Sequence, residues 1–369
     1  MNRMKLGEIL SVKHGWAFKG EYFAEDGEQS ILTPGNFFEK GGFKPNNGKE
    51  RYYTGTYPKE YLCHKGDLIV AMTQQAEGLL GSTALVPENN KYLHNQRIGL
   101  ITCDEKRLNK LFAYYLFMTK SVREQLERSS SGTKVKHTSP EKIYDVEVEI
   151  PDVISQQKIA NLLWAIDEKI ANNNAINDNL EQQMHLIFEN MMAKAATHKL
   201  SGEYTIAQNL ATVVTGKEDA NFSVPNGKYK FFTCSNTPLS CDEYVFDSSS
   251  ILIAGNGDFN VKHYSGKFNA YQRTYVLTPD KKYFGLLYLA SLYRINSFKS
   301  RSSGSIVKFI TKSDVENIPV FIPNDRFYLQ ELNKLIYLQE QNKLENELLV
   351  NLRDWLLPML MNGQATISD

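Results

Sequence analysis

The sequence predicts an α+β protein in which two duplicated α/β domains are separated by two long helices that pair as an antiparallel coiled coil. Three observations predict this architecture. Short motifs occur twice in the same order, the first part of each copy has β-rich runs broken by Gly, Asn and Pro, and the second part has helical apolar spacing. With 369 residues, the chain is long enough for two or three domains with their own cores.

The duplication is visible as four pairs of motifs. They are GDLIVA at 66–71 with SSILIA at 249–254, NQR at 95–97 with YQR at 271–273, SGT at 131–133 with SGS at 303–305, and Ile150-Pro151 with Ile322-Pro323. Positions 132 and 304, and positions 151 and 323, are both 172 apart, whereas positions 96 and 272 are 176 apart. Chance matches would not keep both order and spacing, so we interpret the chain as two related halves.

Each half has the same predicted succession of elements. Short apolar runs at 68–72, 98–103 and 146–151 in the first half, and at 251–255 and 275–277 in the second, are typical of strands. One amphipathic helix is expected near 108–127 and one near 284–298. The Ile-Pro pair then leads into a long segment that is nearly free of glycine.

These long segments predict two helices that need a partner. The apolar stripe of the first contains Ile159, Leu163, Ile166, Ile170, Leu180 and Met184, and that of the second contains Leu335, Leu338, Leu348 and Leu352. Asn173 and Asn177 interrupt the first stripe, as do Gln339, Asn342 and Asn346 the second. Since buried Asn prefers Asn and fixes register, the pattern favours pairing of the two helices over their being core helices of a bundle.

The predicted boundaries follow from these segments. They are a first globular domain at 1–152, a first helix at 153–199, a second globular domain at 200–324 and a second helix at 325–369. Ser155 and Asn324 are the expected helix caps.

Composition narrows the functional classes. The chain has 42 basic and 42 acidic residues, which excludes a simple basic-tail nucleic-acid binder but not one with segregated charge. No apolar stretch reaches membrane length and the N-terminus lacks a signal peptide, so we expect a cytoplasmic protein with no membrane partner. The four cysteines form no CxxC pair, and no metal site is expected.

Motifs for catalysis are missing. The glycines at 255 and 257 lack the third glycine of a dinucleotide turn, and Gly216-Lys217 lacks the preceding glycine of a phosphate-binding loop. The sequence also contains no amino-methyltransferase motif, metal-nuclease motif or hydrolase elbow. We therefore expect a non-catalytic chain. An enzyme with an unrecognised nuclease or methyltransferase site and a scaffold with two protein-binding domains remain alternatives.

Polar loops next to the predicted strands supply candidate DNA contacts. Amide side chains suit adenine and cationic side chains suit guanine or phosphate. The candidates after the first buried strand are Thr73, Gln74 and Gln75, and those after its counterpart are Asn256, Asp258, Asn260, Lys262 and His263. Gln96, Arg97, Gln272 and Arg273 form the repeated pair, for which either DNA contact or a structural ion pair is possible. The remaining candidates belong to two runs without acidic residues, for which a solvated surface is the alternative to phosphate contact. They are Lys134, Lys136 and His137 in the first run, and Arg301, Ser303 and Lys308 in the second.

In order, these motifs resemble the specificity subunits of type I restriction–modification systems. The resemblance covers nearly the whole chain and includes the opening KLGEI at 5–9 and the tail LLPMLMNG at 356–363. It implies two target recognition domains, each of which binds one half of a split site in double-stranded DNA. It also implies that the helices dock methyltransferase (M) subunits and that a restriction (R) subunit can join. S-adenosylmethionine and ATP with Mg would be bound by those partners, and no cofactor by this chain.

Overall fold

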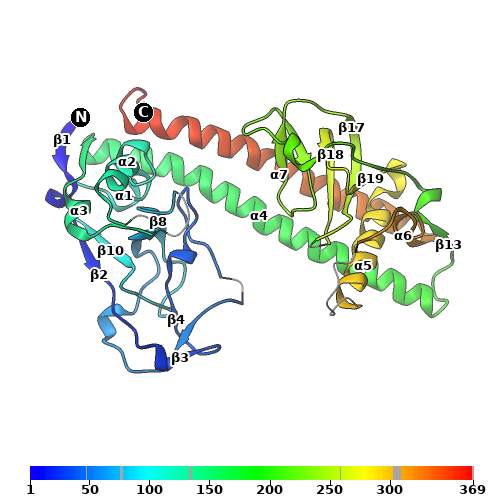
Figure 1. Cartoon of the computed structure of the whole chain (residues 1–369), viewed down its shortest axis with the longest axis horizontal. Coiled ribbons are helices and arrows are strands. Elements are labelled where there is room, and N and C mark those ends of the chain that lie inside the picture. The colour runs from blue at the N-terminus through cyan, green and yellow to red at the C-terminus, as the bar shows by residue number, and fades with distance from the viewer. Residues whose placement is uncertain (47, 75–77, 133–134, 258, 302–308, 368–369) are drawn as a thin grey trace. The chain divides into compact units, whose positions relative to one another are not determined.

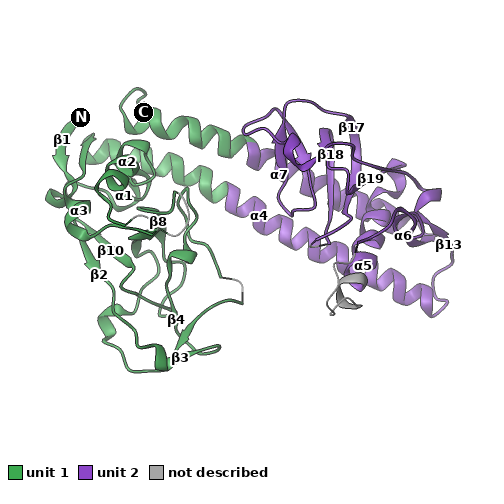
Figure 2. Ribbon diagram, viewed as in Figure 1, with its two compact units in different colours: residues 1–169, 348–369 green, residues 170–347 purple. Residues whose placement is uncertain are grey.

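The computed structural model describes residues 1–46, 48–74, 78–132, 135–257, 259–301 and 309–367, without the side chains of residues 298–301. The chain forms two compact units, which Figure 2 distinguishes by colour. Unit 1 comprises Met1–Lys169 and Leu348–Asp369, and unit 2 comprises Ile170–Glu347. Each unit contains one globular segment and a part of both long helices, because the boundary between the units crosses each helix (Figure 2).

Unit 1 is built on a four-stranded antiparallel sheet. Its order is β2 (Leu10–His14), β10 (Ile98–Cys103), β6 (Leu68–Ala71) and β8 (Thr83–Leu85). A smaller sheet contains β3 (Phe23–Ala24), β5 (Tyr52–Tyr53), β4 (Ser30–Ile31) and β9 (Tyr92–Leu93). Two further pairs are β1 (Asn2–Lys5) with β12 (Glu147–Ile150), and β7 (Thr73–Gln74) with β11 (Lys136–His137).

The helix expected at 108–127 is two helices. They are α1 (Lys110–Leu116) and α2 (Lys120–Ser129), and α3 (Pro140–Tyr144) follows. The break lies at Thr119, whose hydroxyl donates to the carbonyl of Leu116 at 2.7 Å. Thr119 has an extended backbone conformation and is the N-cap residue of α2. The apolar periodicity of the sequence continues through this break, so it predicted one continuous helix.

Unit 2 is built on a six-stranded sheet. Its order is β14 (Ala211–Thr215), β19 (Thr274–Pro279), β17 (Phe246–Ala254), β18 (Val261–Ala270), β15 (Tyr229–Phe232) and β16 (Leu239–Cys241). β15 and β18 are parallel, and the other neighbours are antiparallel. β13 (Gly202–Ile206) pairs with β20 (Pro319–Pro323), and the helices are α5 (Phe284–Arg301) and α6 (Lys312–Glu316) (Figure 1).

The two units repeat one arrangement of strands. In unit 1, β2, β10 and β6 are successive neighbours, and β14, β19 and β17 have the same order in unit 2. The strand that opens each globular segment also pairs with the strand that closes it, as β1 with β12 and β13 with β20. The predicted duplication is therefore confirmed at the level of strand topology.

The two long helices are α4 (Val153–Ala196) and α7 (Arg326–Met361). In unit 1, a guanidinium nitrogen of Arg353 donates to Asp167 at 2.8 Å. In unit 2, Asn173 donates to Asn346 at 2.9 Å, and Asn342 donates to Asn177 at 3.0 Å. In unit 2, the residue numbers of these contacts rise along α4 as they fall along α7, so the helices pair antiparallel there as expected.

Polar residues occupy much of this helix interface. Asn173, Asn177 and Gln339 are almost fully buried, together with the predicted Ile159, Leu163, Ile166, Leu180, Met184 and Leu335. Ile170 is half-buried. Leu338, Leu348 and Leu352 are instead exposed by 41%, 63% and 44%, so their assignment to the interface is wrong. The inward positions of α7 are taken by Gln339, Asn342 and Asn346, and the neighbouring leucines therefore lie outside.

Aspartates cap both long helices. The carboxylate of Asp152 accepts hydrogen bonds from the backbone and the hydroxyl of Ser155 at 3.0 and 2.8 Å. Asp325 likewise accepts from the backbone of Phe327 at 2.9 Å. Ser155 is thus the donor to the cap, and Asn324 lies one residue too early, where its N–H binds the carbonyl of Ser201.

The interface predicts unequal effects for two substitutions on the long helices. Ile166 is 7% exposed, so Ile166→Asp should lower the free energy of unfolding of unit 1 by about 3 kcal/mol, since it removes apolar burial and buries a charge. Leu348→Asp is the matched control and should change it by at most about 0.5 kcal/mol. Chemical denaturation of both variants measures this, and equal losses would contradict the assigned interface.

Candidate nucleic-acid interface

The repeated Gln-Arg pair forms the same tight turn in both units. In unit 1, the N–H of Ile98 donates to the carbonyl of Asn95 at 2.9 Å, and β10 begins directly after the turn. In unit 2, the N–H of Thr274 donates to the carbonyl of Tyr271 at 2.8 Å, and β19 begins there. We call residues 95–98 and 271–274 the Gln-Arg turns. Their Gln and Arg side chains are exposed in both units.

Each Gln-Arg turn is joined by backbone hydrogen bonds to the end of a central strand. The N–H of Met72, just after β6, donates to the carbonyl of Arg97 at 3.0 Å. The N–H of Gly255, just after β17, donates to the carbonyl of Arg273 at 2.8 Å. The strand end and the turn, which the sequence repeats separately, therefore lie together in space.

The segment after the Ser-Gly loop reaches the same strand end. Thr138 donates its N–H to the carbonyl of Met72 at 2.9 Å, and Ile310 donates its N–H to the carbonyl of Gly255 at 2.8 Å. The strand end, the turn and the returning loop thus form one backbone junction in each unit. Two repeated motifs, the strand end and the Gln-Arg turn, therefore meet in this junction together with the segment that follows the third.

Close backbone packing fixes the turns from a third side. A Cβ atom on Gly15 would lie 2.1 Å from the carbonyl oxygen of Asn95, and one on Gly216 would lie 2.0 Å from that of Ala270. Only glycine fits at these positions, which directly follow β2 and β14. The N–H groups of Gln96 and Gln272 also bind the carbonyls of Trp16 and Glu218, at 3.1 and 2.9 Å.

The structure decides against an ion pair for the two arginines. Across the described ranges, no hydrogen bond or ion pair engages the guanidinium of Arg97 or that of Arg273. Their backbones are held on several sides while their charged groups face solvent. Both are therefore available to a ligand.

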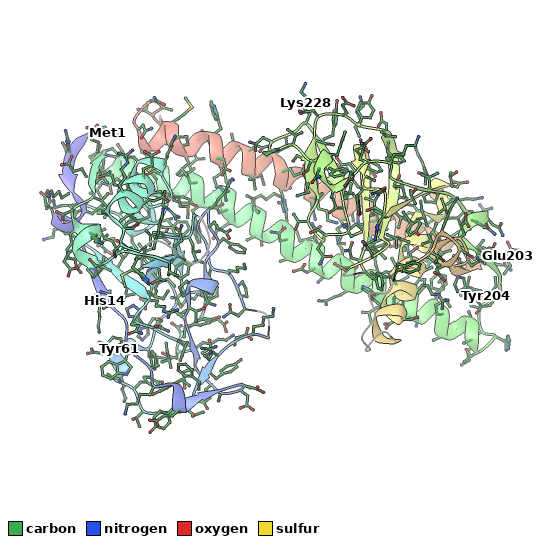
Figure 3. All side chains as sticks on the ribbon, in the orientation of Figure 1. Met1, His14, Tyr61, Glu203, Tyr204 and Lys228 are labelled. Carbon is green, nitrogen blue, oxygen red and sulfur yellow. The ribbon has the colours of Figure 1, made fainter. Side chains whose placement is uncertain are left out.

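A pocket of about 300 Å³ lies beside Arg97 in unit 1. Apart from Met72, it is lined by side chains that can donate hydrogen bonds: His14, Thr73, Gln96, Arg97, His137 and Thr138. We call this the donor pocket. Neither Asp nor Glu lines it, and the hydroxyl of Thr138 is buried with no hydrogen-bond partner among the described residues. His14, at the end of β2, is labelled in Figure 3.

Two candidates after β6 have structural roles. Gln74 is buried and its Oε1 accepts from the backbone of Leu80 at 2.9 Å, so it holds the loop and is not available to DNA. Thr73 is also buried, with its hydroxyl 3.1 Å from Nδ1 of His137. The exposed member of that contact is His137.

Two candidates after β17 are turned into unit 2. Asn260 donates to the carbonyl of Cys234 at 2.8 Å. Lys262 donates to the carbonyls of Thr233, at 3.2 Å, and Ser235, and burial lowers the pKa of its amine. Both side chains thus hold backbone carbonyls of unit 2, a structural role that competes with their predicted contact to DNA. Asn256 is half-buried at the start of this loop.

His263 also has a structural role in place of the predicted contact to DNA, because it fastens the sheet of unit 2 to α7. Its side chain is 2% exposed, and its two ring nitrogens lie 2.9 Å from Glu340 and 2.8 Å from Gln339. Burial alone would raise the pKa of the Glu340 carboxyl. Hydrogen bonds from His263 and Ser265, with electrostatic attraction to His263 and Lys343, outweigh burial and hold this pKa below its ordinary value.

The basic runs are only partly described. Lys136 forms an ion pair with Glu127, a structural contact that competes with phosphate binding. Gln75, Lys134, Asp258, Ser303 and Lys308 lie outside the described residues, as does the side chain of Arg301 at the end of α5.

His14 and Thr138 were missed by the sequence analysis. His14 could have been found by comparing the two halves, because His14 and Thr215 each end a strand and each precede the glycine that contacts the Gln-Arg turn. Thr138 has no such signal, because its hydroxyl joins the pocket only through the fold. Its counterpart in the junction is apolar Ile310.

Other kinds of site are not found in the described ranges. No three or more His, Cys, Asp or Glu side chains gather there as metal ligands would. Among the helices described, none has both the length and the apolar character to cross a bilayer.

Comparisons with known proteins agree with a class of two-domain proteins built on paired long helices. A family model described as the type I restriction modification DNA specificity domain matches residues 1–182 and 210–351. The chain belongs to this family, the specificity subunits of type I restriction–modification systems.

Individual relatives are more distant. The specificity subunit of EcoDI from Escherichia coli is 36% identical over 164 residues, which are 42% of this chain and 37% of that subunit. The MjaIX specificity subunit from Methanocaldococcus jannaschii is 22% identical over 70% of this chain and 69% of its own. The crystal structure of an S subunit from M. genitalium has a TM-score of 0.64 at 18% identity, covers 100% of this chain and 96% of its own, and confirms the fold.

The contact between His263 and α7 generates a prediction about acid stability. Glu340→Gln should lower the free energy of unfolding by about 1–3 kcal/mol at pH 7, because the buried imidazole of His263 and the hydroxyl of Ser265 lose a charged acceptor. A carboxyl with a lowered folded-state pKa stabilises above its unfolded value and loses that contribution as pH falls through the folded value. The difference from the wild type should therefore shrink below about pH 4.3.

Glu347→Gln is the matched control, because Glu347 forms an exposed ion pair with Lys230 at 2.7 Å. It should cost at most about 1 kcal/mol. Urea denaturation between pH 3.5 and 7 measures both variants, and a Glu340 effect that grows toward low pH would contradict the assignment.

Proposed function

We propose that this chain recognises a split, asymmetric site in double-stranded DNA, with each globular segment contacting one half. The observation that carries the proposal is the duplicated junction, which presents an exposed Gln-Arg turn at the same place in two units. Arg and Gln are suited to phosphate oxygens and base edges. The side chains around the two junctions differ, and this favours two different half-sites over a perfect palindrome.

The proposal includes M subunits that dock on the long helices. Leu348, Leu352 and Trp355 lie on one stripe of α7 in unit 1, since their spacing is i, i+4 and i+7. They are 63%, 44% and 60% exposed. An exposed apolar stripe of this kind is typical of a surface that a partner protein covers.

In this proposal the chain itself is not catalytic. Methyl transfer with S-adenosylmethionine is carried out by the M subunits, and cleavage that depends on ATP and Mg by an R subunit when it joins the complex. This assignment is supported by the lack of methyltransferase, nuclease and nucleotide-binding motifs in the sequence and by the family to which the chain belongs. The complex would act on DNA in the cytoplasm.

Expression with its M subunit, followed by sequencing of methylated bases in the host genome, tests this function. We expect methylation at one bipartite sequence with a fixed, sequence-independent spacer. The purified chain alone should transfer no methyl group and cleave no DNA. Methylation by the chain alone would favour an enzyme with an unrecognised site, whereas a folded chain that binds no duplex would favour a protein scaffold.

The duplicated plan predicts that the half-sites are exchangeable. Residues 200–324 are replaced with the equivalent segment of a relative that recognises a different DNA sequence. This exchange should change one half of the methylated site. The other half and the spacer length should stay the same, because residues 1–152 and both long helices are retained. Methylome sequencing measures the result, and a change in both halves would contradict separate recognition by the two segments.

A further inference from the structure

We propose that the two Gln-Arg turns are equivalent binding sites for phosphate groups of the DNA backbone, and that the donor pocket beside Arg97 receives one such phosphate in unit 1. This inference rests on the proposed DNA function and adds the chemical group that these residues contact. It assigns Arg97 and Arg273 to positioning of the DNA and leaves base recognition to other side chains.

The first argument comes from what the two units share. Both turns carry Gln and Arg at the same positions, and equivalent backbone hydrogen bonds hold Arg97 and Arg273. A shared side chain on a shared frame suits a feature that both half-sites share. The phosphodiester backbone is such a feature whatever the base sequence, whereas two different half-sites need not share a base at this place.

The second argument is the chemistry of the donor pocket. Its polar lining consists of two histidines, two threonine hydroxyls, an amide and a guanidinium, without a carboxylate. Such a lining favours an anion with several acceptor oxygens, and arginine binds phosphate through two parallel hydrogen bonds. The buried hydroxyl of Thr138 has no partner in the described part of the chain, and a phosphate oxygen would provide an acceptor.

The third argument is preorganisation. The carbonyl of Arg97 is bound by Met72, and its N–H donates to the side chain of Asn95 at 3.3 Å. Gly15 packs directly against the same turn. Since the backbone is already fixed, only the Arg97 side chain has to be ordered when a phosphate binds.

The surroundings of the two turns differ between the units. His14 and His137 in unit 1 correspond to Thr215 and Phe309 in unit 2, by their positions at the end of the first central strand and just before the junction. Phe309 is 71% exposed, and His14, His137 and Thr215 are exposed as well. The arginine of the turn is thus shared by both units, whereas the side chains that complete the donor pocket in unit 1 are replaced in unit 2.

Salt dependence of binding distinguishes phosphate contacts from base contacts. The full-length wild type and its variants are titrated with a mixed-sequence 30-base-pair duplex at several KCl concentrations, so the recognition sequence need not be known. Each phosphate contact contributes about 0.9 to the slope of log affinity against log salt. Arg97→Ala and Arg273→Ala should each lower the slope by about 0.9, and the double variant by about twice as much.

Two further variants control the measurement. Arg97→Lys keeps the charge and should keep the slope, although it loses the paired hydrogen bonds and some affinity. Arg3→Ala removes another exposed arginine, one that is ion-paired with Glu147, and it should leave the slope unchanged. Thermal denaturation of each variant establishes that it is folded.

The outcomes separate this inference from the proposed function. If the wild type showed no salt-dependent binding to duplex DNA, both the proposed function and the phosphate assignment would be contradicted. Normal salt-dependent binding by the wild type, with unchanged slopes in Arg97→Ala and Arg273→Ala, would overturn the phosphate assignment alone. An Arg97→Ala complex with M subunits that methylates a relaxed half-site, again without a change in slope, would show that Arg97 contacts a base.

Discussion

Pairing of buried amides between α4 and α7 is the constraint on which the rest of the molecule depends. Asn173 and Asn177 are almost completely buried, and each contacts an asparagine of the opposite helix in unit 2. An unsatisfied buried amide costs about 1–3 kcal/mol, so sliding one helix along the other would leave several polar groups without partners. Apolar contacts alone would tolerate such a slip. The amides therefore set the register, and each globular segment is attached to helices whose register is fixed.

A second constraint operates in each globular segment. The backbone junction of strand end, Gln-Arg turn and returning loop consists mainly of N–H and carbonyl groups, which do not depend on side-chain identity. The side chains around it can therefore vary while the turn keeps its position. The two units show this division, since the same turn is surrounded by different side chains in each.

Duplication and helix pairing could be predicted from the sequence, because motif order and apolar spacing carry that information, whereas the order of strands in the sheets could not. Individual contacts could not. Leu348 and Leu352 fit an apolar stripe by spacing, but asparagines of α7 face α4 in their place. Lys262 and His263 look like a DNA-binding loop, yet their partners are a backbone carbonyl and α7, which lie far away in sequence. The Gln-Arg turns were identified correctly as a repeated pair, whereas the choice between ion pair and exposed donor required the fold.

The discontinuity of unit 1 has a consequence for folding during synthesis. Its core joins Ile159 and Leu163 of α4 to Leu360 and Met361 near the end of α7, and all of unit 2 lies between them in the chain. Unit 2 is one uninterrupted stretch, so all its residues are synthesised before the last part of unit 1. Unit 1 keeps part of its apolar surface uncovered until the last turns of α7 have been made. A premature stop within the last turns of α7 would spare the globular part of unit 2 and leave unit 1 exposed to chaperones and proteases.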